Sequence, residues 1–133
     1  MIDSCKSVLK LEEFYFSDFS FTKKDSCSDY DDRDIKIGFS KEHKTDNGVL
    51  ELKLAARVCF EEHFDLKLIA YGKFTISTSN ENVESFVKNA IAILFPYIRS
   101  EITLLTSQPN MKPIILPPIN INAFFEQQDK QAT

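Results

Sequence analysis

Hydrophobic and polar residues alternate along the first half of the chain, which is the pattern of β-strands with one buried face. The clearest run is 50–60, in which every second residue is apolar and most residues between them are charged. The run 64–76 repeats this alternation, and less regular apolar runs occupy 8–21 and 34–39. The first half of the sequence therefore predicts four strands.

The run 8–21 changes parity along its length. Phe14 and Phe16 fall on one face of an ideal strand, whereas Phe19 and Phe21 fall on the other. Because side chains alternate strictly along a regular strand, this change indicates either that both faces are covered or that a β-bulge shifts the register. The sequence leaves both alternatives open.

Asn47–Gly48, between the second and third runs, is a strong signal for a tight hairpin. Both residue types tolerate the positive φ that two-residue hairpin turns require. A short turn also separates 50–60 from 64–76. We therefore expect a four-stranded antiparallel meander in an α+β fold, with the strands adjacent in chain order and one face buried.

The apolar period becomes helical in the second half. Thr78 and Glu81 fit a capping box, and apolar residues follow at helical spacing, which predicts one long helix over 78–107. Beyond Phe86, apolar residues lie on most of its circumference. Since a small sheet covers only one side of a helix, we expect a partner subunit to cover the rest.

Pro96 lies inside this predicted helix. A proline removes one backbone N–H and crowds the carbonyl four residues earlier, here that of Ala92. Pro96 therefore either separates two helices or bends or loosens one. Four further prolines keep 108–119 extended, and a final helix is expected to start near Asn120 or Asn122.

Length and composition fit a single domain, taken as 1–133 with a core over about 8–128. The net charge of −4 argues against a nucleic-acid partner, because phosphate binding needs clustered Lys and Arg. Three cysteines without CxxC spacing indicate a reducing compartment, and no N-terminal apolar segment resembles a signal peptide. The apolar cluster Ala90–Phe95 is too short for membrane insertion. These features favour a cytoplasmic protein.

Residues with catalytic potential are few. His43 and His63 lie in predicted turns without metal-ligand spacing, and Cys59 beside Arg57 is better explained as an inert thiol. Nucleophile-elbow and phosphate-loop motifs are missing from the sequence. We therefore expect neither an enzyme nor a metal or cofactor site. The excess of apolar residues instead indicates a cleft for extended chains, or a loop that merely closes the core.

Four segments carry a resemblance to a known family. ILFPYIRSEI (93–102) and LPPININAFF (116–125) resemble the ILFPYAR-E-I and LAPVNFDALF-like segments of the SecB chaperone family. YFSDFSF (15–21) is similar to its first-strand pattern Y-x-x-D-I/F-S-F, and YGKFTI (71–76) to its G-x-F pattern. The resemblance covers roughly 8–128, and LFPY-x-R is its most specific part.

The resemblance implies an ATP-independent holdase that keeps unfolded precursor proteins in apolar grooves and passes them to SecA. It also implies a homotetramer built as a dimer of dimers, with long helices packed between subunits. An alternative within the family is a dedicated chaperone of an antitoxin in a toxin–antitoxin system. A second alternative, from a different functional class, is a small α+β ligand-binding domain or enzyme without chaperone activity.

The family's site residues transfer to positions of this chain as implied roles. The residues implied to bind peptide are aromatic or aliphatic, namely Phe14, Tyr30, Phe39, Phe74, Leu116 and Phe124. The oligomer interface falls to residues of the long helix, namely Ile91, Phe95, Tyr97, Ile98 and Ile102.

SecA docking is implied for Asp18, as part of an acidic surface. The sequence departs from the family there, because Lys67 stands where the family has a glutamate and Thr22 replaces another acidic residue. These departures weaken the implied SecA contact and lean toward the antitoxin role.

Overall fold

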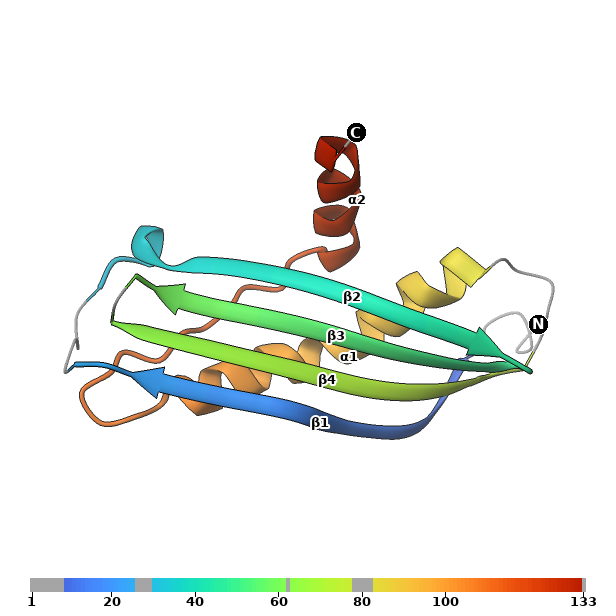
Figure 1. The fold of residues 1–133 in the computed structure, drawn as a ribbon, viewed down its shortest axis with the longest axis horizontal. Coiled ribbons are helices and arrows are strands. Elements are labelled where there is room, and N and C mark those ends of the chain that lie inside the picture. The colour runs from blue at the N-terminus through green and yellow to red at the C-terminus, as the bar shows by residue number, and fades with distance from the viewer. Residues whose placement is uncertain (1–8, 26–29, 62, 78–82, 133) are drawn as a thin grey trace.

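The computed structural model describes residues 9–25, 30–61, 63–77 and 83–132. It contains one antiparallel sheet, a long helix across one face of that sheet, and a shorter helix that projects away from it (Figure 1). The elements are β1 (Leu9–Lys23), a short 3-10 turn (Asp32–Asp34), β2 (Lys36–Asp46), β3 (Val49–Phe60), β4 (Phe64–Ile76), α1 (Val83–Thr106) and α2 (Ile121–Ala132). The α+β class and the four antiparallel strands followed by two helices are confirmed.

The order of the strands differs from the expected meander. In space the strands run β1-β4-β3-β2, so β2, β3 and β4 form a meander and β1 lies beside β4 rather than β2. This is a Greek-key order, in which the long connection from β1 to β2 joins the two edges of the sheet. Hydrophobic patterning identifies strands but not their partners. The long polar stretch between β1 and β2 is what allows this arrangement.

The central pair β3–β4 forms as its alternation predicts. The residues of β3 that face α1 are almost fully buried from Leu50 to Val58, and those of β4 are buried from Phe64 to Phe74. Asn47 and Gly48 have φ values of 51° and 76°, which confirms the hairpin between β2 and β3. This pair therefore fixes the floor on which the remaining elements pack.

β1 carries two register shifts, between Leu11 and Glu13 and between Phe16 and Asp18. Because of the second shift, Phe16 pairs with Ala70 and Phe21 pairs with Leu66, and both partners face α1. The bulges thus bring phenylalanines of opposite sequence parity to the same side of the sheet. The bulge alternative is the correct one for this strand.

β2 is longer than the sequence pattern predicts. It extends beyond Phe39 to Asp46 and stays paired with β3 over its whole length. Residues 40–46 are polar and largely exposed, so they lack the alternation that marks a strand. Backbone pairing with the well-defined β3 and the hairpin turn hold this edge in place.

α1 runs as a single helix through Pro96, so the two-helix alternative is excluded. The helix ends at Thr106, one residue before the predicted end at 107. Its predicted capping box at Thr78 and Glu81 lies outside the described residues. The face buried against the sheet comprises Phe86, Val87, Ala90, Ile91, Leu94, Phe95, Ile98, Ile102 and Thr106.

The segment 107–120, here called the crossover, is non-helical as predicted and joins α1 to α2. Asn120 ends it by capping α2, since its side-chain Oδ1 accepts a hydrogen bond from the Ala123 N–H at 3.1 Å. Lys88 and Glu126 form an ion pair of 3.0 Å between α1 and α2. α2 is therefore tied to the long helix by an ion pair.

Candidate functional site

The crossover is attached to α1 through its backbone. The Thr103 hydroxyl donates to the Ile114 carbonyl at 2.8 Å, and the Ile114 N–H donates to the buried Thr106 hydroxyl at 2.9 Å. Farther along, Arg99 Nε donates to the Leu116 carbonyl at 3.2 Å. These bonds hold the segment extended beside α1, although its prolines donate no N–H bonds.

Side chains of the attached segment alternate between the interior and the surface. Ile114 and Leu116 are buried, whereas Ile115 between them is 77% exposed. Ile119 farther along is also exposed. Sequence reasoning named Leu116 and missed Ile115, although alternation in a proline-held extended segment could have found it. The crossover thus presents apolar side chains to solvent.

Three aromatic rings meet where β2, α1 and α2 come together. Phe39 packs edge-on against Phe95 and Phe124, with ring centroids 5.6 Å and 5.4 Å away. Phe124 continues the cluster to Phe125, over which the Lys41 ammonium lies 5.1 Å from the centroid. The sequence-predicted residues Phe39 and Phe124 are therefore brought into direct contact. Phe124 remains partly exposed at the edge of this cluster.

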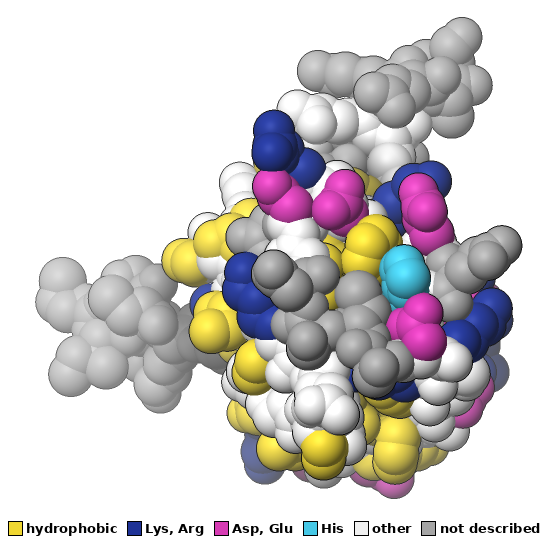
Figure 2. Space-filling model, turned by 90° about the vertical axis from the view of Figure 1, so that its left-hand side faces the viewer, with side chains coloured by type: hydrophobic (Ala, Val, Ile, Leu, Met, Phe, Trp, Pro, Cys, Tyr) yellow, Lys and Arg dark blue, Asp and Glu magenta, His cyan; other side chains and the backbone are white. Residues whose placement is uncertain are grey.

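Tyr30 lies at the opposite end of the crossover. It is buried against Phe60 and Phe64, and its hydroxyl donates to the Lys112 carbonyl. Figure 2 shows this end of the molecule, where hydrophobic side chains are scattered among acidic and basic ones. Tyr30 therefore anchors the start of the crossover, while Leu116 and Phe124 lie farther along the same path.

Two predicted peptide-binding residues lie elsewhere. Phe14 in β1 packs against Tyr97 of α1, at 4.6 Å between centroids, and not against the crossover. Phe74 in β4 has no exposed surface and belongs to the core beneath α1. An alternating apolar position does not reveal which of its neighbours cover it, so the sequence pattern could not separate these two from the others.

The residues predicted for the oligomer interface are mostly covered by their own chain. Ile91, Ile98 and Ile102 have no exposed surface, and Phe95 has almost none. Tyr97 is 48% exposed. The helical stripe that the sequence reveals most clearly is the one that packs on the sheet. The large apolar residues that α1 leaves exposed are Val83, Tyr97 and Leu104.

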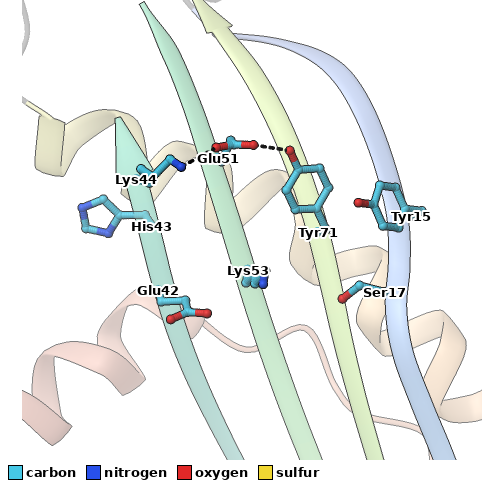
Figure 3. A pocket seen from close by; sticks show the side chains of 8 residues that line it. All are labelled: Tyr15, Ser17, Glu42, His43, Lys44, Glu51, Lys53 and Tyr71. Carbon is cyan, nitrogen blue, oxygen red and sulfur yellow. Dashed lines mark hydrogen bonds and ion pairs between the residues drawn. The ribbon is translucent and has the colours of Figure 1, made fainter. Parts of the chain in front are cut away.

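The face of the sheet away from α1 is polar. On it Tyr71 donates its hydroxyl to Glu51 at 2.6 Å, and Lys44 lies 3.7 Å from the same carboxylate (Figure 3). The bond to Glu51 raises the pKa of Tyr71 to about 12, and it lowers the pKa of Glu51. Asp18 is exposed and borders a hollow that also contains Lys67.

Groups with catalytic potential are used structurally. His63 Nδ1 lies 2.7 Å from Asp25, so this pair joins the β3–β4 turn to the residues that follow β1, and the imidazole packs at a tilt against Phe60. Among the described residues, His, Cys, Asp and Glu do not gather in groups that could hold a metal. Neither described helix combines the length and apolar character needed to span a membrane.

A model of the family described as preprotein translocase subunit SecB matches residues 3–132. The chain belongs to the SecB family. SecB proteins are chaperones and not enzymes, in agreement with the function class inferred from the sequence. The sheet followed by two helices is accordingly a SecB-like fold.

Relatives cover the chain to different extents. The SecB-family match to the protein-export protein SecB of Azoarcus sp. strain BH72 is 25% identical over 139 residues, covering 96% of this chain and 92% of that protein. An uncharacterized protein of Methanocaldococcus jannaschii is 41% identical over 58 residues, which is 42% of this chain and 37% of that protein. The second match thus spans little more than a third of the archaeal protein.

A solved structure shares the fold. The Mycobacterium tuberculosis SecB-like chaperone Rv1957, in complex with a ChAD peptide from the HigA1 antitoxin, superposes with a TM-score of 0.67. The two sequences are 11% identical, and the match covers 84% of this chain and 87% of that one. At this identity the likeness establishes the SecB-like fold alone.

Proposed function

We propose that this SecB-family chain is an ATP-independent holdase that binds unfolded precursor proteins for export. The observation that carries the proposal is the exposure of two large apolar side chains of the crossover, Ile115 and Ile119, together with the partly exposed ring of Phe124 at the start of α2. Large apolar side chains on one exposed segment are a typical feature of a binding surface. The client surface we propose comprises the exposed Ile115 and Ile119 and the partly exposed Phe124. The buried Phe39 and Leu116 support it from within, and Tyr30 anchors the start of the crossover.

Apolar burial supplies the binding energy in this proposal. Removing apolar surface from water contributes about 25 cal/mol per Å², before the cost of ordering the client is subtracted. An extended client touches several exposed side chains in turn, so weak contacts add along one chain. Because such contacts need no particular hydrogen bonds, the surface accepts many sequences. This property suits a chaperone of non-native proteins.

Self-association is the second part of the proposal. Tyr97 and Leu104 are exposed on α1, seven residues apart and so on one face of the helix, and Phe14 packs against Tyr97. We assign this side to contacts between subunits of a cytoplasmic homotetramer. Phe14 thereby moves from the peptide-binding set to the subunit interface.

Suppression of aggregation tests the holdase function. The protein is mixed, without nucleotide, with a reductively unfolded client whose aggregation is followed by light scattering. We expect suppression by the unmodified chain and a clear loss in the double variant Ile115→Ser, Ile119→Ser. Tyr15→Ser is the matched control, because Tyr15 is also an exposed apolar residue but lies on the other face of the sheet. Equal suppression by both variants would exclude the crossover as the client surface.

A dedicated antitoxin chaperone is the second candidate. The Rv1957 fold is solved with an antitoxin peptide, and Lys67 lies beside Asp18 where SecA docking requires acidic character. Binding to purified SecA separates the two roles. Saturable SecA binding that Asp18→Asn weakens supports export. Loss of SecA binding, together with a toxin–antitoxin gene pair beside the coding gene, supports the antitoxin role.

A further inference from the structure

The crossover is held unequally along its length. As far as Ile114, side chains from β1, α1 and the connection before β2 bond to its main chain, namely those of Lys23, Tyr30, Thr103 and Thr106. Among the described residues, the stretch 115–120 receives one hydrogen bond from α1 or the sheet, which Arg99 Nε donates to the Leu116 carbonyl at 3.2 Å. The residues that follow, 117–120, are all exposed. These residues, here called the bridge, lead from the Arg99 bond to α2.

The far end of the bridge is also held by α1. Asn122 Nδ2, in the first turn of α2, donates to the Lys88 carbonyl at 3.0 Å, and the neighbouring Ile121 is buried. Lys88 and Arg99 are eleven residues apart, which is close to three full turns of α1. Both attachments therefore lie on one side of α1, about 16 Å apart along its axis.

The bridge has little slack between these two attachments. From Leu116 to Ile121 the chain has five steps, and an extended proline-rich segment covers about 16 Å over that length, at about 3.1 Å per residue. Pro117 and Pro118 fix their own φ angles and restrict the residue before each of them, so the bridge does not shorten by coiling. The place of Ile119, which follows directly, therefore depends on where the two attachments lie.

We propose that Arg99 is a positioning residue of the client surface, a role that rests on the holdase function proposed above. Its bond to the Leu116 carbonyl fixes one end of the taut bridge. The bridge in turn holds Ile119 at a set distance from Ile115 and from Phe124. An extended client then meets apolar side chains that are already in place, which lowers the cost of ordering them on binding. Without the Arg99 bond, one end of the bridge is released and the contacts become independent of each other.

Two labelled peptides test this role in the full-length protein. One carries a single cluster of phenylalanine and leucine, and the other carries two such clusters separated by about four serine and glycine residues. Fluorescence anisotropy gives the two dissociation constants, and their ratio reports how well the contacts of the client surface act together. For the unmodified chain we expect the two-cluster peptide to bind at least about tenfold more tightly. In Arg99→Met, which keeps an apolar stem and removes the donor, this advantage should fall at least about threefold, with the affinity for the one-cluster peptide unchanged.

Two further variants separate positioning from folding, which circular dichroism checks in each variant. Asn122→Ala releases the other end of the bridge and should lower the ratio in the same way, and the losses should not add when it is combined with Arg99→Met. Arg57→Met is the matched control, because it makes the same substitution on the outer face of the sheet, where Arg57 bonds to Asp65. An unchanged ratio in Arg99→Met, or an equal fall in Arg57→Met, overturns the role of Arg99. Failure of the unmodified chain to bind either peptide overturns the holdase function itself.

Discussion

The rings of Phe14 in β1 and Tyr97 in α1 lie 4.6 Å apart, and this contact joins the edge strand of the sheet to the outward side of the long helix. Phe16 packs against Phe14 at 5.3 Å and extends the contact along the strand. Tyr97 keeps about half of its surface exposed. The contact is therefore an apolar ledge that its own chain covers only in part.

Replacement of this ledge should weaken self-association. Tyr97→Ser removes the exposed ring, so we expect a shift toward smaller species in multi-angle light scattering at micromolar concentration. Tyr15→Ser is the control, because Tyr15 is 47% exposed and Tyr97 is 48% exposed, on opposite faces of the sheet. A shift of equal size in both variants would place the subunit contact elsewhere.

Thr106 should hold the crossover in place. Its buried hydroxyl donates to the Ile102 carbonyl at 2.8 Å and accepts from the Ile114 N–H at 2.9 Å. Thr106→Val leaves that buried N–H without a partner, so we expect a loss of about 1–3 kcal/mol of unfolding free energy. Faster hydrogen exchange of the Ile114 amide would locate the change. Ser107→Ala, which removes an exposed hydrogen bond from Ser107 to the Thr103 carbonyl, should cost much less.

Gly72 is required where β4 passes under α1. A Cβ atom there would lie 3.0 Å from side-chain atoms of both Leu94 and Phe74. Gly72→Ala should therefore destabilise the fold by about 1–3 kcal/mol in urea unfolding at one protein concentration. Gly38→Ala is the control, because nothing lies within 4 Å of its Cβ position, and we expect a change below about 1 kcal/mol. Similar costs at both positions would contradict the close approach of α1.

The Tyr71–Glu51 bond should give a pH dependence at alkaline pH. The hydrogen bond raises the pKa of Tyr71 from 10.0 to about 12. The stability that the neutral Tyr71 phenol contributes is therefore fully present below pH 10.0 and is lost as the pH rises through about 12. Ultraviolet titration of tyrosinate should show one late tyrosine. Glu51→Gln should return the pKa of Tyr71 toward its ordinary value. Glu42→Gln, in the same hollow, should leave the late titration of Tyr71 unchanged.

The sequence predicted the strands better than it predicted which strands pair with each other. Alternation over 50–60 and 64–76 found β3 and β4, because these strands bury one full face. The position of β1 beside β4 was missed, since pairing of distant strands leaves no local pattern. The polar half of β2 was missed for a related reason. Its pairing with β3 defines it, and the residues of this half are polar and exposed, so no apolar alternation marks them.

The candidate site was predicted in part. Motif resemblance pointed to Phe39 and Phe124, which meet in the structure at 5.4 Å. It also pointed to Phe74 and Ile98, which their own chain buries. A single chain's hydrophobic pattern reports that a side chain avoids water, but not whether the core, a second subunit or a client covers it. The exposed Ile115 was missed although alternation along the extended segment, with Ile114 and Leu116 buried on either side of it, could have indicated it.

The crossover is held to α1 by its main-chain atoms, and it exposes an apolar side chain, that of Ile115, which takes no part in those bonds. Thr103, Thr106 and Arg99 bind main-chain atoms of Ile114 and Leu116 and not their side chains. The Ile115 side chain is therefore not needed to hold the crossover to α1. If Ile115 belongs to the client surface as proposed, substitutions there change the preference for clients and leave the hydrogen bonds between the crossover and α1 intact. The same freedom gives protein engineers one place at which to retune the chaperone.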